Sequence, residues 1–334
     1  MTTLITGGSG FIGLALAERL IAQGERVVLF DLAAPGMDLL AQPELRGAAL
    51  VTGDVTDAAD IDRAMNEARI DRVIHTAAMT PNVQREHDQA RRIVDVNIGG
   101  TVNVLERTAL RPAIKRITVL SSVAVYGFSE PAASGLFEED VSPPAPAALY
   151  GITKLAAEQA ALRIGHLHDL DVRVVRLGPV FGAWENHTAA RAAMSPHHQI
   201  LAMAQAGRDV VLPRAMTADW VYSRDAADGI VRISTADTLR HATYHVGGGV
   251  RTDLLQWCEI VARHIPGFRW QLGNDDADGN IIYSLPKDRA SLSIARLAAD
   301  TGFEPAHNLD AAARDYLAWL KGEAIAPATA GVAS

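Results

Sequence analysis

The chain has 334 residues, of which 49% are hydrophobic and 21% are charged. This is the balance of a soluble globular protein, long enough for one large domain and a smaller lobe. Its formal net charge of −8 argues against nucleic acid or an anionic membrane as the main partner. The sequence has neither a signal peptide at its start nor an apolar run long enough to span a bilayer, so we expect a cytoplasmic protein. The single cysteine, Cys258, excludes an internal disulfide and lies in a helical pattern, where a buried structural thiol is expected.

Strand and helix patterns alternate through the first half of the chain. Short apolar runs rich in β-branched residues predict strands at 3–6, 26–31, 48–54, 72–78, 116–122 and 172–178. Helical patterns lie between them at 11–23, 57–68, 88–110 and 150–168. Continuous apolar strands are typical of parallel sheets that are covered on both faces. The alternation therefore predicts an α/β fold with a Rossmann-type doubly wound parallel sheet.

The alternation ends after Gly178. Helical patterns near 223–235, 252–265 and 309–321 are separated by irregular segments, which predicts a smaller, mostly C-terminal substrate-binding lobe. We place the dinucleotide-binding domain at 1–178 and the lobe at 179–322, and we expect the helix near 223–235 to return to the first domain. Residues 323–334 are small, include proline and lack periodicity, so we expect a disordered tail.

A glycine-rich turn, TGGSGFIG, follows the first predicted strand and opens the first predicted helix. The spacing of Gly7, Gly10 and Gly13 permits a tight turn, lets the backbone approach a pyrophosphate and allows close packing of helix on strand. The helix N-terminus then offers free N–H groups to an anion. Asp31 ends the second strand, where a carboxylate accepts the ribose hydroxyls of NAD and repels the 2′-phosphate of NADP. Because no arginine follows in DLAAPG, we expect NAD.

Several further motifs follow in order, and together they resemble one family. They are GDVTD (53–57), HTAA (75–78), DVNIGGTVNVLE around Asn97, SSVAVYG (121–127), YGITK (150–154), RLGPVFG (176–182) and DWVYSRDAAD (219–228), with weaker signals in ARLAADTGFEP (295–305). On these motifs the chain resembles the extended short-chain dehydrogenases/reductases of the NAD-dependent epimerase/dehydratase family. The likeness covers nearly the whole chain.

The resemblance implies a set of residues around NAD. They are Gly7, Gly10, Phe11, Ile12, Gly13, Asp31, Asp54, Val55, Ala77, Ala78, Asn97, Tyr150, Lys154 and Pro179. Asp54 and Val55 would lie beside the adenine ring, although Asp54 is equally suited to cap a turn. The resemblance also implies a homodimer joined through the helices near 88–110 and 150–168.

The same resemblance makes Tyr150 the general acid/base, with Lys154 as its partner and Ser122 at the substrate oxygen. Tyr150 and Lys154 lie four positions apart and therefore share one face of a helix. A free tyrosine has a pKa near 10, and an ammonium about 4 Å away contributes roughly 4 kcal/mol toward its ionised form at a dielectric of about 20. We therefore expect Lys154 to make the phenolate accessible. In isolation, the pair would be ordinary for a surface helix.

Departures from the family's sequence patterns limit the reactions and the classes of substrate that we expect. The acid and base of sugar dehydratases would stand at Val123 and Ala124, so a 4,6-dehydratase is not expected. Pro179 and Ala218 occupy positions where nucleotide-sugar enzymes usually carry a substrate-binding Asn and a diphosphate-binding Arg. We interpret these gaps as evidence against a nucleotide sugar, unless Arg214 or Arg289 compensates from another direction.

Polar and aromatic residues near the predicted site suggest a small hydroxylated substrate such as a sugar, sugar acid or lactone. The candidates for binding it are Thr80, Ser122, Trp184, His187, Arg191 and Trp220, with Arg191 as a possible carboxylate anchor. No metal is expected, because the adjacent His197 and His198 point to different sides of a helix and lack acidic or cysteine partners at ligand spacing. His75 is expected to serve packing.

The sequence thus predicts an NAD-dependent oxidoreductase that oxidises a secondary alcohol of a small polar substrate by hydride transfer. The alternative is a nucleotide-sugar epimerase that retains NAD and returns the hydride to the other face of the ketone. A third reading is an NAD-sensing protein without catalysis, in which an intact Ser–Tyr–Lys set would be superfluous.

Overall fold

The computed structural model describes residues 1–334 except 189, 192, 275–277, 284–287 and 323–334. Within these residues, seven parallel strands form the central sheet in the order β10-β6-β5-β4-β1-β2-β3. The strands are β1 (Thr2–Thr6), β2 (Arg26–Asp31), β3 (Ala49–Thr52), β4 (Arg72–His75), β5 (Arg116–Ser122), β6 (Val172–Leu177) and β10 (Thr243–Val246). The predicted doubly wound parallel sheet is confirmed. The tail expected at 323–334 lies outside the described residues.

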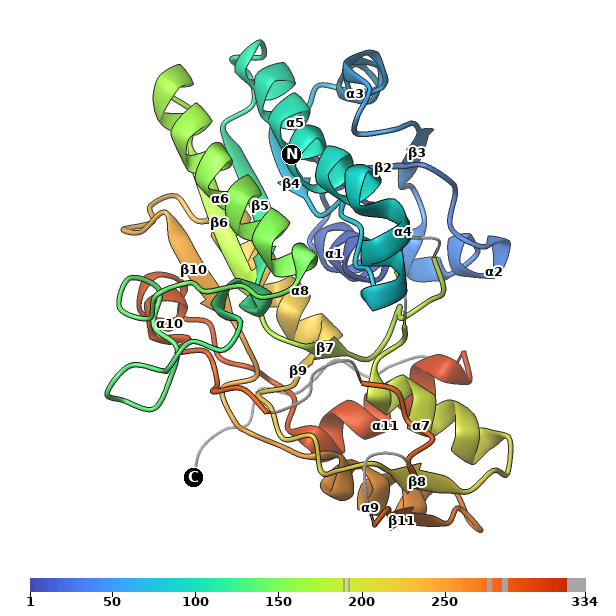
Figure 1. Ribbon diagram of the computed structural model, residues 1–334. Coiled ribbons are helices and arrows are strands. Elements are labelled where there is room, and N and C mark those ends of the chain that lie inside the picture. Colours follow the sequence, from blue (N-terminus) through green and yellow to red (C-terminus); the bar gives the residue numbers. More distant parts are fainter. Residues whose placement is uncertain (189, 192, 275–277, 284–287, 323–334) are drawn as a thin grey trace.

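Helices cover both faces of the sheet (Figure 1). On one face α1 (Phe11–Ala22) packs against α8 (Ser223–Thr235). On the other lie α3 (Ala58–Asn66), α4 (Val83–Val94), α5 (Gly100–Ala109) and α6 (Leu149–His168). The helix expected at 88–110 is two helices, α4 and α5, joined by a π-helical turn at Asp95–Gly99. Burial on both faces explains why these strands read as continuous apolar runs.

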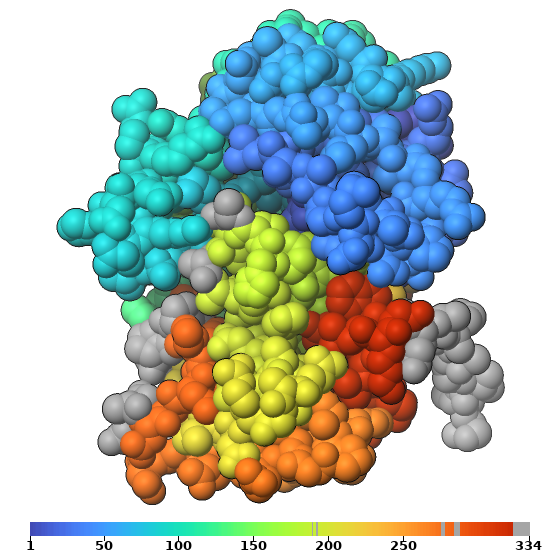
Figure 2. Space-filling model, turned by 90° about the vertical axis from the view of Figure 1, so that its right-hand side faces the viewer, coloured from blue at the N-terminus to red at the C-terminus, as the bar shows by residue number. Residues whose placement is uncertain are grey.

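The later part of the chain builds a lobe beside the carboxyl ends of the strands (Figure 1). In the space-filling view, the atoms of this lobe lie below those of the N-terminal part (Figure 2). It contains α7 (Pro196–Gln205), β8 (Val210–Leu212), α9 (Leu254–His264), β11 (Trp270–Leu272) and α11 (Leu309–Leu320). Two short parallel pairs, β8 with β11 and β7 (Val180–Phe181) with β9 (Val221–Tyr222), lie outside the main sheet. Cys258 on α9 is fully buried, as expected for a structural thiol, and burial raises the pKa of its thiol to about 12.

Two segments of the second half return to the Rossmann sheet. β10 pairs with β6 at its edge, and α8 packs on α1, with α10 (Ala295–Thr301) beside both β10 and α8. The remaining short elements are α2 (Met37–Leu40) and 3₁₀ turns at Pro43–Leu45 and Val123–Tyr126. Among the described residues, no helix has the length and apolar character needed to cross a membrane.

β1 lies between β2 and β4, so the chain runs outward in opposite directions from the centre of the sheet. In open parallel sheets, ligands bind at the carboxyl ends of the strands beside this switch point. The fold therefore predicts a ligand site among the loops that follow β1, β2, β4 and β5.

Candidate active site

A cavity of about 880 Å³ lies at this switch point. Its wall combines the turn after β1, the ends of β2 and β5, the loop after β4, the start of α6 and the segment after β7. Residues predicted for cofactor or catalysis that line it are Gly7, Gly10, Phe11, Ile12, Gly13, Asp31, Asp54, Val55, Ala77, Ala78, Tyr150 and Lys154. Residues distant in the sequence thus converge on one cavity, as the motifs required.

The glycine turn leaves no room for side chains. Gly7 has φ of +69°, and a Cβ there would lie 2.7 Å from the backbone nitrogen of Ala77. A Cβ on Gly13 would lie 2.3 Å from the carbonyl oxygen of Gly7. Gly10, the residue that precedes α1, places no side chain over the first N–H groups of the helix. These N–H groups are consequently available to an anion, which fits the pyrophosphate of a dinucleotide.

Asp31 is held in place by the same turn. Its carboxylate accepts hydrogen bonds from the backbone N–H of Ser9 at 3.0 Å and of Leu32 at 2.8 Å. Burial raises the pKa of Asp31, and these two N–H groups oppose that rise. The carboxylate lines the cavity at the end of β2, where it fits a ribose diol.

Asp54 has a partner that the sequence did not indicate. Its carboxylate pairs with the Arg92 guanidinium at 2.5 Å and accepts the Thr56 N–H at 2.9 Å. Burial favours a higher pKa for Asp54, but these hydrogen bonds outweigh it and the pKa is lowered. Arg92 also lines the cavity, yet it lies in an ordinary charged stretch of α4, so no local pattern marks it.

Tyr150 and Lys154 lie on the first turns of α6, and Ser122 ends β5. The Ser122 hydroxyl oxygen accepts the N–H of Ala124 at 3.1 Å, and the same side chain hydrogen-bonds Tyr150. Lys154 is only 5% exposed. Ser121, the residue before Ser122, lines the cavity, whereas Ser122 is not part of the cavity wall. The three predicted catalytic residues are thus brought together around one end of the cavity.

The electrostatics of Tyr150 differ from the sequence-based expectation. Burial raises its pKa, while the hydrogen bond with Ser122 and the charge of Arg191 lower it. Burial also lowers the pKa of Lys154 to about 8. A low-polarity environment disfavours phenolate and ammonium alike. Arg191, which the sequence did not link to Tyr150, thus contributes positive charge that favours ionised Tyr150.

Asn97 positions the start of α6. Its carbonyl oxygen accepts the Met79 N–H at 2.7 Å, and its amide donates to the Thr153 hydroxyl at 3.0 Å. That hydroxyl in turn donates to the backbone carbonyl of Tyr150 at 3.0 Å. Asn97 is buried, and neither it nor Pro179 is among the residues that line the cavity, so the cofactor contacts expected of them stay predictions.

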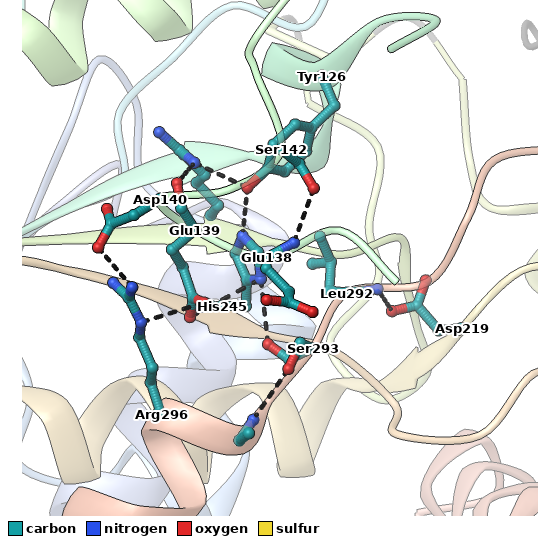
Figure 3. Close-up of polar contacts among 12 residues, drawn as sticks. Tyr126, Glu138, Glu139, Asp140, Ser142, Asp219, His245, Leu292, Ser293 and Arg296 are labelled. Atoms are coloured by element: carbon teal, nitrogen blue, oxygen red, sulfur yellow. Dashed lines mark hydrogen bonds and ion pairs between the residues drawn. The ribbon is translucent and has the colours of Figure 1, made fainter. Parts of the chain in front are cut away.

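A second buried network holds the chain between Ser122 and Tyr150 (Figure 3). The Tyr126 hydroxyl hydrogen-bonds the His245 ring at 2.6 Å, and the backbone N–H of His245 donates to the Glu139 carboxylate at 3.0 Å. Arg296 pairs with Glu139 at 3.5 Å and with Asp140. The segment that leaves β5 is therefore fixed to β10 and α10 before it enters α6, which holds both ends of the catalytic set.

The histidines flagged in the sequence have no metal-binding arrangement. His75 lies between the hydroxyls of Thr6 at 2.6 Å and Thr101 at 2.9 Å, and burial lowers its pKa to about 3. His197 is buried, with its ring stacked on that of Phe181 at 4.0 Å between centroids. Within the described part of the chain, no group of three or more histidine, cysteine or acidic side chains could hold a metal.

The predicted substrate residues divide into two groups. Thr80, His187 and Arg191 line the cavity. Trp184 and Trp220 do not, and the expectation that they line it needs correction. The Trp184 side chain is fully buried and its indole N–H donates to Glu18 at 2.8 Å, while Trp220 donates to the Met216 carbonyl at 3.2 Å. Both tryptophans are core residues, because their rings are buried and each indole N–H donates to an oxygen of the protein.

Arg214 and Arg289, the possible replacements for a diphosphate-binding arginine, also lie outside the cavity wall. Arg214 forms an ion pair with Asp288, and its guanidinium lies 5.9 Å from the centre of the Tyr283 ring. Arg289 donates to the Gly127 carbonyl at 3.0 Å. In this structure both arginines have protein partners.

Comparison with known proteins decides the family. A model of the NAD-dependent epimerase/dehydratase family matches residues 3–247. The chain belongs to this family. Its members' cofactor is NAD, in agreement with Asp31 and with the glycine turn.

Several relatives of the chain are named as sugar epimerases. The chain is 30% identical to a "probable UDP-glucuronate 4-epimerase" of Rhizobium meliloti (strain 1021), over 96% of both chains. It is 26% identical to a dTDP-L-rhamnose 4-epimerase of Burkholderia thailandensis, over 96% of this chain and 95% of that one. The solved UDP-glucuronic acid 4-epimerase from Bacillus cereus, in complex with UDP-glucuronic acid and NAD, has a TM-score of 0.78 at 20% identity, covering 96% of this chain and 99% of that one.

Proposed function

We propose that the protein is an NAD-dependent sugar epimerase that acts on a nucleotide-linked sugar and retains its cofactor between half-reactions. The observation that carries this proposal is that Tyr150, hydrogen-bonded to Ser122, lines with Lys154 the cavity that also contains the glycine turn and Asp31. The names of the relatives favour epimerisation over net oxidation of a small polar substrate.

Tyr150 would accept the proton of the reacting hydroxyl and later return it. The Ser122 hydroxyl would hold the substrate oxygen beside Tyr150, and Lys154 would bind the ribose next to the nicotinamide. When bound, NAD⁺ supplies the hydride acceptor. Burial raises the pKa of Tyr150, and the Ser122 hydrogen bond and the positive charge of Arg191 oppose that rise, which favours its use as an acid/base.

A dehydrogenase that acts on a sugar or sugar acid without a nucleotide is the second candidate. Ala218 and Pro179 stand where diphosphate- and substrate-binding residues are usual in nucleotide-sugar enzymes of the family. Arg214, which could have compensated, is already paired with Asp288. These departures favour a substrate whose anchor differs from a diphosphate.

The substitution Tyr150→Phe tests the catalytic assignment. It removes the proton-transfer group while keeping the ring, so we expect turnover to fall at least about 100-fold. Isothermal titration should show NADH affinity changed by less than about threefold. Undiminished turnover in Tyr150→Phe would contradict the mechanism and would also revive a non-catalytic NAD-binding role.

Cofactor retention and a substrate panel separate the two candidates. Incubation with UDP-glucuronic acid, UDP-glucose, dTDP-rhamnose, free uronic acids and free sugars should be followed by NADH absorbance and by chromatography of the sugars. Epimerisation predicts interconverted nucleotide sugars without accumulating NADH. Stoichiometric NADH formation confined to free sugars or sugar acids would instead establish the dehydrogenase.

A further inference from the structure

Arg191 lies on the long connection between β7 and α7, and its backbone is tied to the loop after β4. The Thr80 N–H donates to the Ala190 carbonyl at 3.0 Å, and Thr80 and Arg191 form a parallel β-bridge. Both residues line the large cavity. The connection is therefore fixed where the cofactor loop and the catalytic end of the cavity meet.

The guanidinium of Arg191 is only partly used by the protein. Its Nη2 lies 2.7 Å from the Glu185 carboxylate, and its carbon lies 5.2 Å from the centre of the Phe11 ring. Its Nη1 is buried and has no hydrogen-bond acceptor among the described residues. A buried donor on a charged group is costly to leave unpaired, so this nitrogen is suited to a ligand atom.

Glu185 explains how the guanidinium is held there. Its two carboxylate oxygens accept the Ser195 N–H at 2.5 Å and the Ser195 hydroxyl at 2.6 Å, and the residue is 3% exposed. A carboxylate fixed in this way orients Arg191 through one nitrogen. Nη1, which has no acceptor among the described residues, is then placed for a second, geometrically specific contact.

The other charged groups of the cavity wall do not compete for Arg191. Asp54 is paired with Arg92, and Asp31 is bound by two backbone N–H groups of its own turn. Lys154, the remaining cation, lies with Arg191 near Tyr150. The catalytic end of the cavity wall thus carries positive charge without a facing carboxylate in the described wall.

We propose that Arg191 binds an anionic oxygen group of a ligand in this cavity. Two sources share this chemistry. One is the pyrophosphate of the cofactor, because Phe11 begins α1 and the N-terminus of this helix is the pyrophosphate site of the fold. The other is a carboxylate or phosphate of the substrate beside Tyr150, and this second source rests on the proposed function.

Binding measurements on the full chain, after nucleotide removal on charcoal, test the proposal without relying on turnover. ADP-ribose probes the cofactor pyrophosphate. UDP-glucuronic acid and UDP-glucose, titrated into NADH-loaded protein, probe a substrate carboxylate and a substrate diphosphate. Arg191→Gln should lower the affinity for at least one of these ligands fivefold or more. The control Arg263→Gln removes the same charge from an exposed pair with Asp310 in the same lobe.

The pattern of losses identifies the anion. Weaker binding of ADP-ribose would show that Arg191 binds the cofactor pyrophosphate. Weaker binding of UDP-glucuronic acid alone would show that it binds a substrate carboxylate. An equal loss of affinity for both nucleotide sugars would show that it binds the substrate diphosphate. The double variant Glu185→Gln with Arg191→Gln removes both charges of the buried pair and should show the same losses if the single variant folds poorly. Changes below fivefold for all three ligands in the folded variant would overturn the proposal. A chain inactive on every sugar, but with weakened ADP-ribose binding in Arg191→Gln, would reject only the proposed function.

Discussion

Burial of the Lys154 ammonium lowers the stability of the folded protein. Its ammonium has a pKa of 10.5 when unperturbed, and burial lowers the pKa to about 8 in the folded protein, with the Glu158 carboxylate opposing the shift. Between these two values the unfolded chain binds more protons than the folded one, so stability rises with pH across that interval. Below pH 8 the full penalty applies, on the order of 3 kcal/mol. A residue retained at such a cost is expected at a functional site.

Replacing Lys154 by Met should therefore stabilise the protein while removing its activity. We expect a gain of about 1–3 kcal/mol in the free energy of unfolding at pH 7, because an apolar chain of similar length replaces a desolvated ammonium. The gain should shrink as the pH rises from 8 toward 10.5, where the unfolded lysine also loses its proton. Urea unfolding at several pH values measures this. A Lys154→Met variant less stable than the parent at pH 7, or a gain independent of pH, would contradict the assigned burial cost.

At the scale of elements, the segment after β7 is anchored to the cofactor helix. Trp184 has a left-handed φ of +71°, and its indole N–H reaches Glu18 on α1. Glu18 also accepts two hydrogen bonds from Arg224 on α8, at 2.8 and 3.0 Å. A single carboxylate thus joins α1, α8 and the segment that carries Arg191.

Removal of this carboxylate should be costly. Glu18→Ala leaves the Trp184 N–H without its acceptor and leaves Arg224 with only one of its two carboxylate partners, Asp315. We therefore expect a loss of about 2–4 kcal/mol in the free energy of unfolding. Arg263→Ala, which breaks an exposed pair with Asp310, should cost less than about 1 kcal/mol. Urea denaturation of both variants gives the comparison. Equal losses would show that the Glu18 contacts are no stronger than a surface ion pair.

These elements also show what the sequence could predict. Strands such as β2 and β5 and the helix α6 were predicted within a residue or two, because burial on both faces and helical periodicity are local patterns. The glycine turn and Asp31 were equally visible, since their spacing is fixed by the turn itself. The π-helical break around Asn97 was not, because DVNIGG continues a helical pattern through it.

The properties of the site that the sequence could not show depend on contacts between distant segments. The position of Trp184 after β7 suggested a substrate contact, but its indole N–H donates to Glu18, which is 166 positions away in the sequence. The influence of Arg191 on Tyr150 crosses from the lobe to the sheet. Lys154 was expected to lower the pKa of Tyr150, and sequence spacing alone could not show that burial works against both charged forms.

For the whole molecule, we propose a homodimer, as the family resemblance implied. α4, α5 and α6 pack side by side on one outer face of the sheet (Figure 1). On this face Val94 is 37% exposed and Ile152 is 46% exposed, although both are large apolar side chains. A two-fold axis through such a face would bring each patch against the same patch of a second copy.

The double substitution Val94→Asp with Ile152→Asp should dissociate that dimer. Each new carboxylate would have to be buried at the interface, and the two-fold symmetry would repeat the cost in both copies. Light scattering after size-exclusion chromatography should give twice the chain mass of 35.6 kDa for the parent and a single chain mass for the variant. Leu272→Asp, at a 51% exposed position on β11 in the other lobe, serves as the control and should remain dimeric. A monomeric parent at micromolar concentration, or a dimeric double variant, would place the interface elsewhere or remove it.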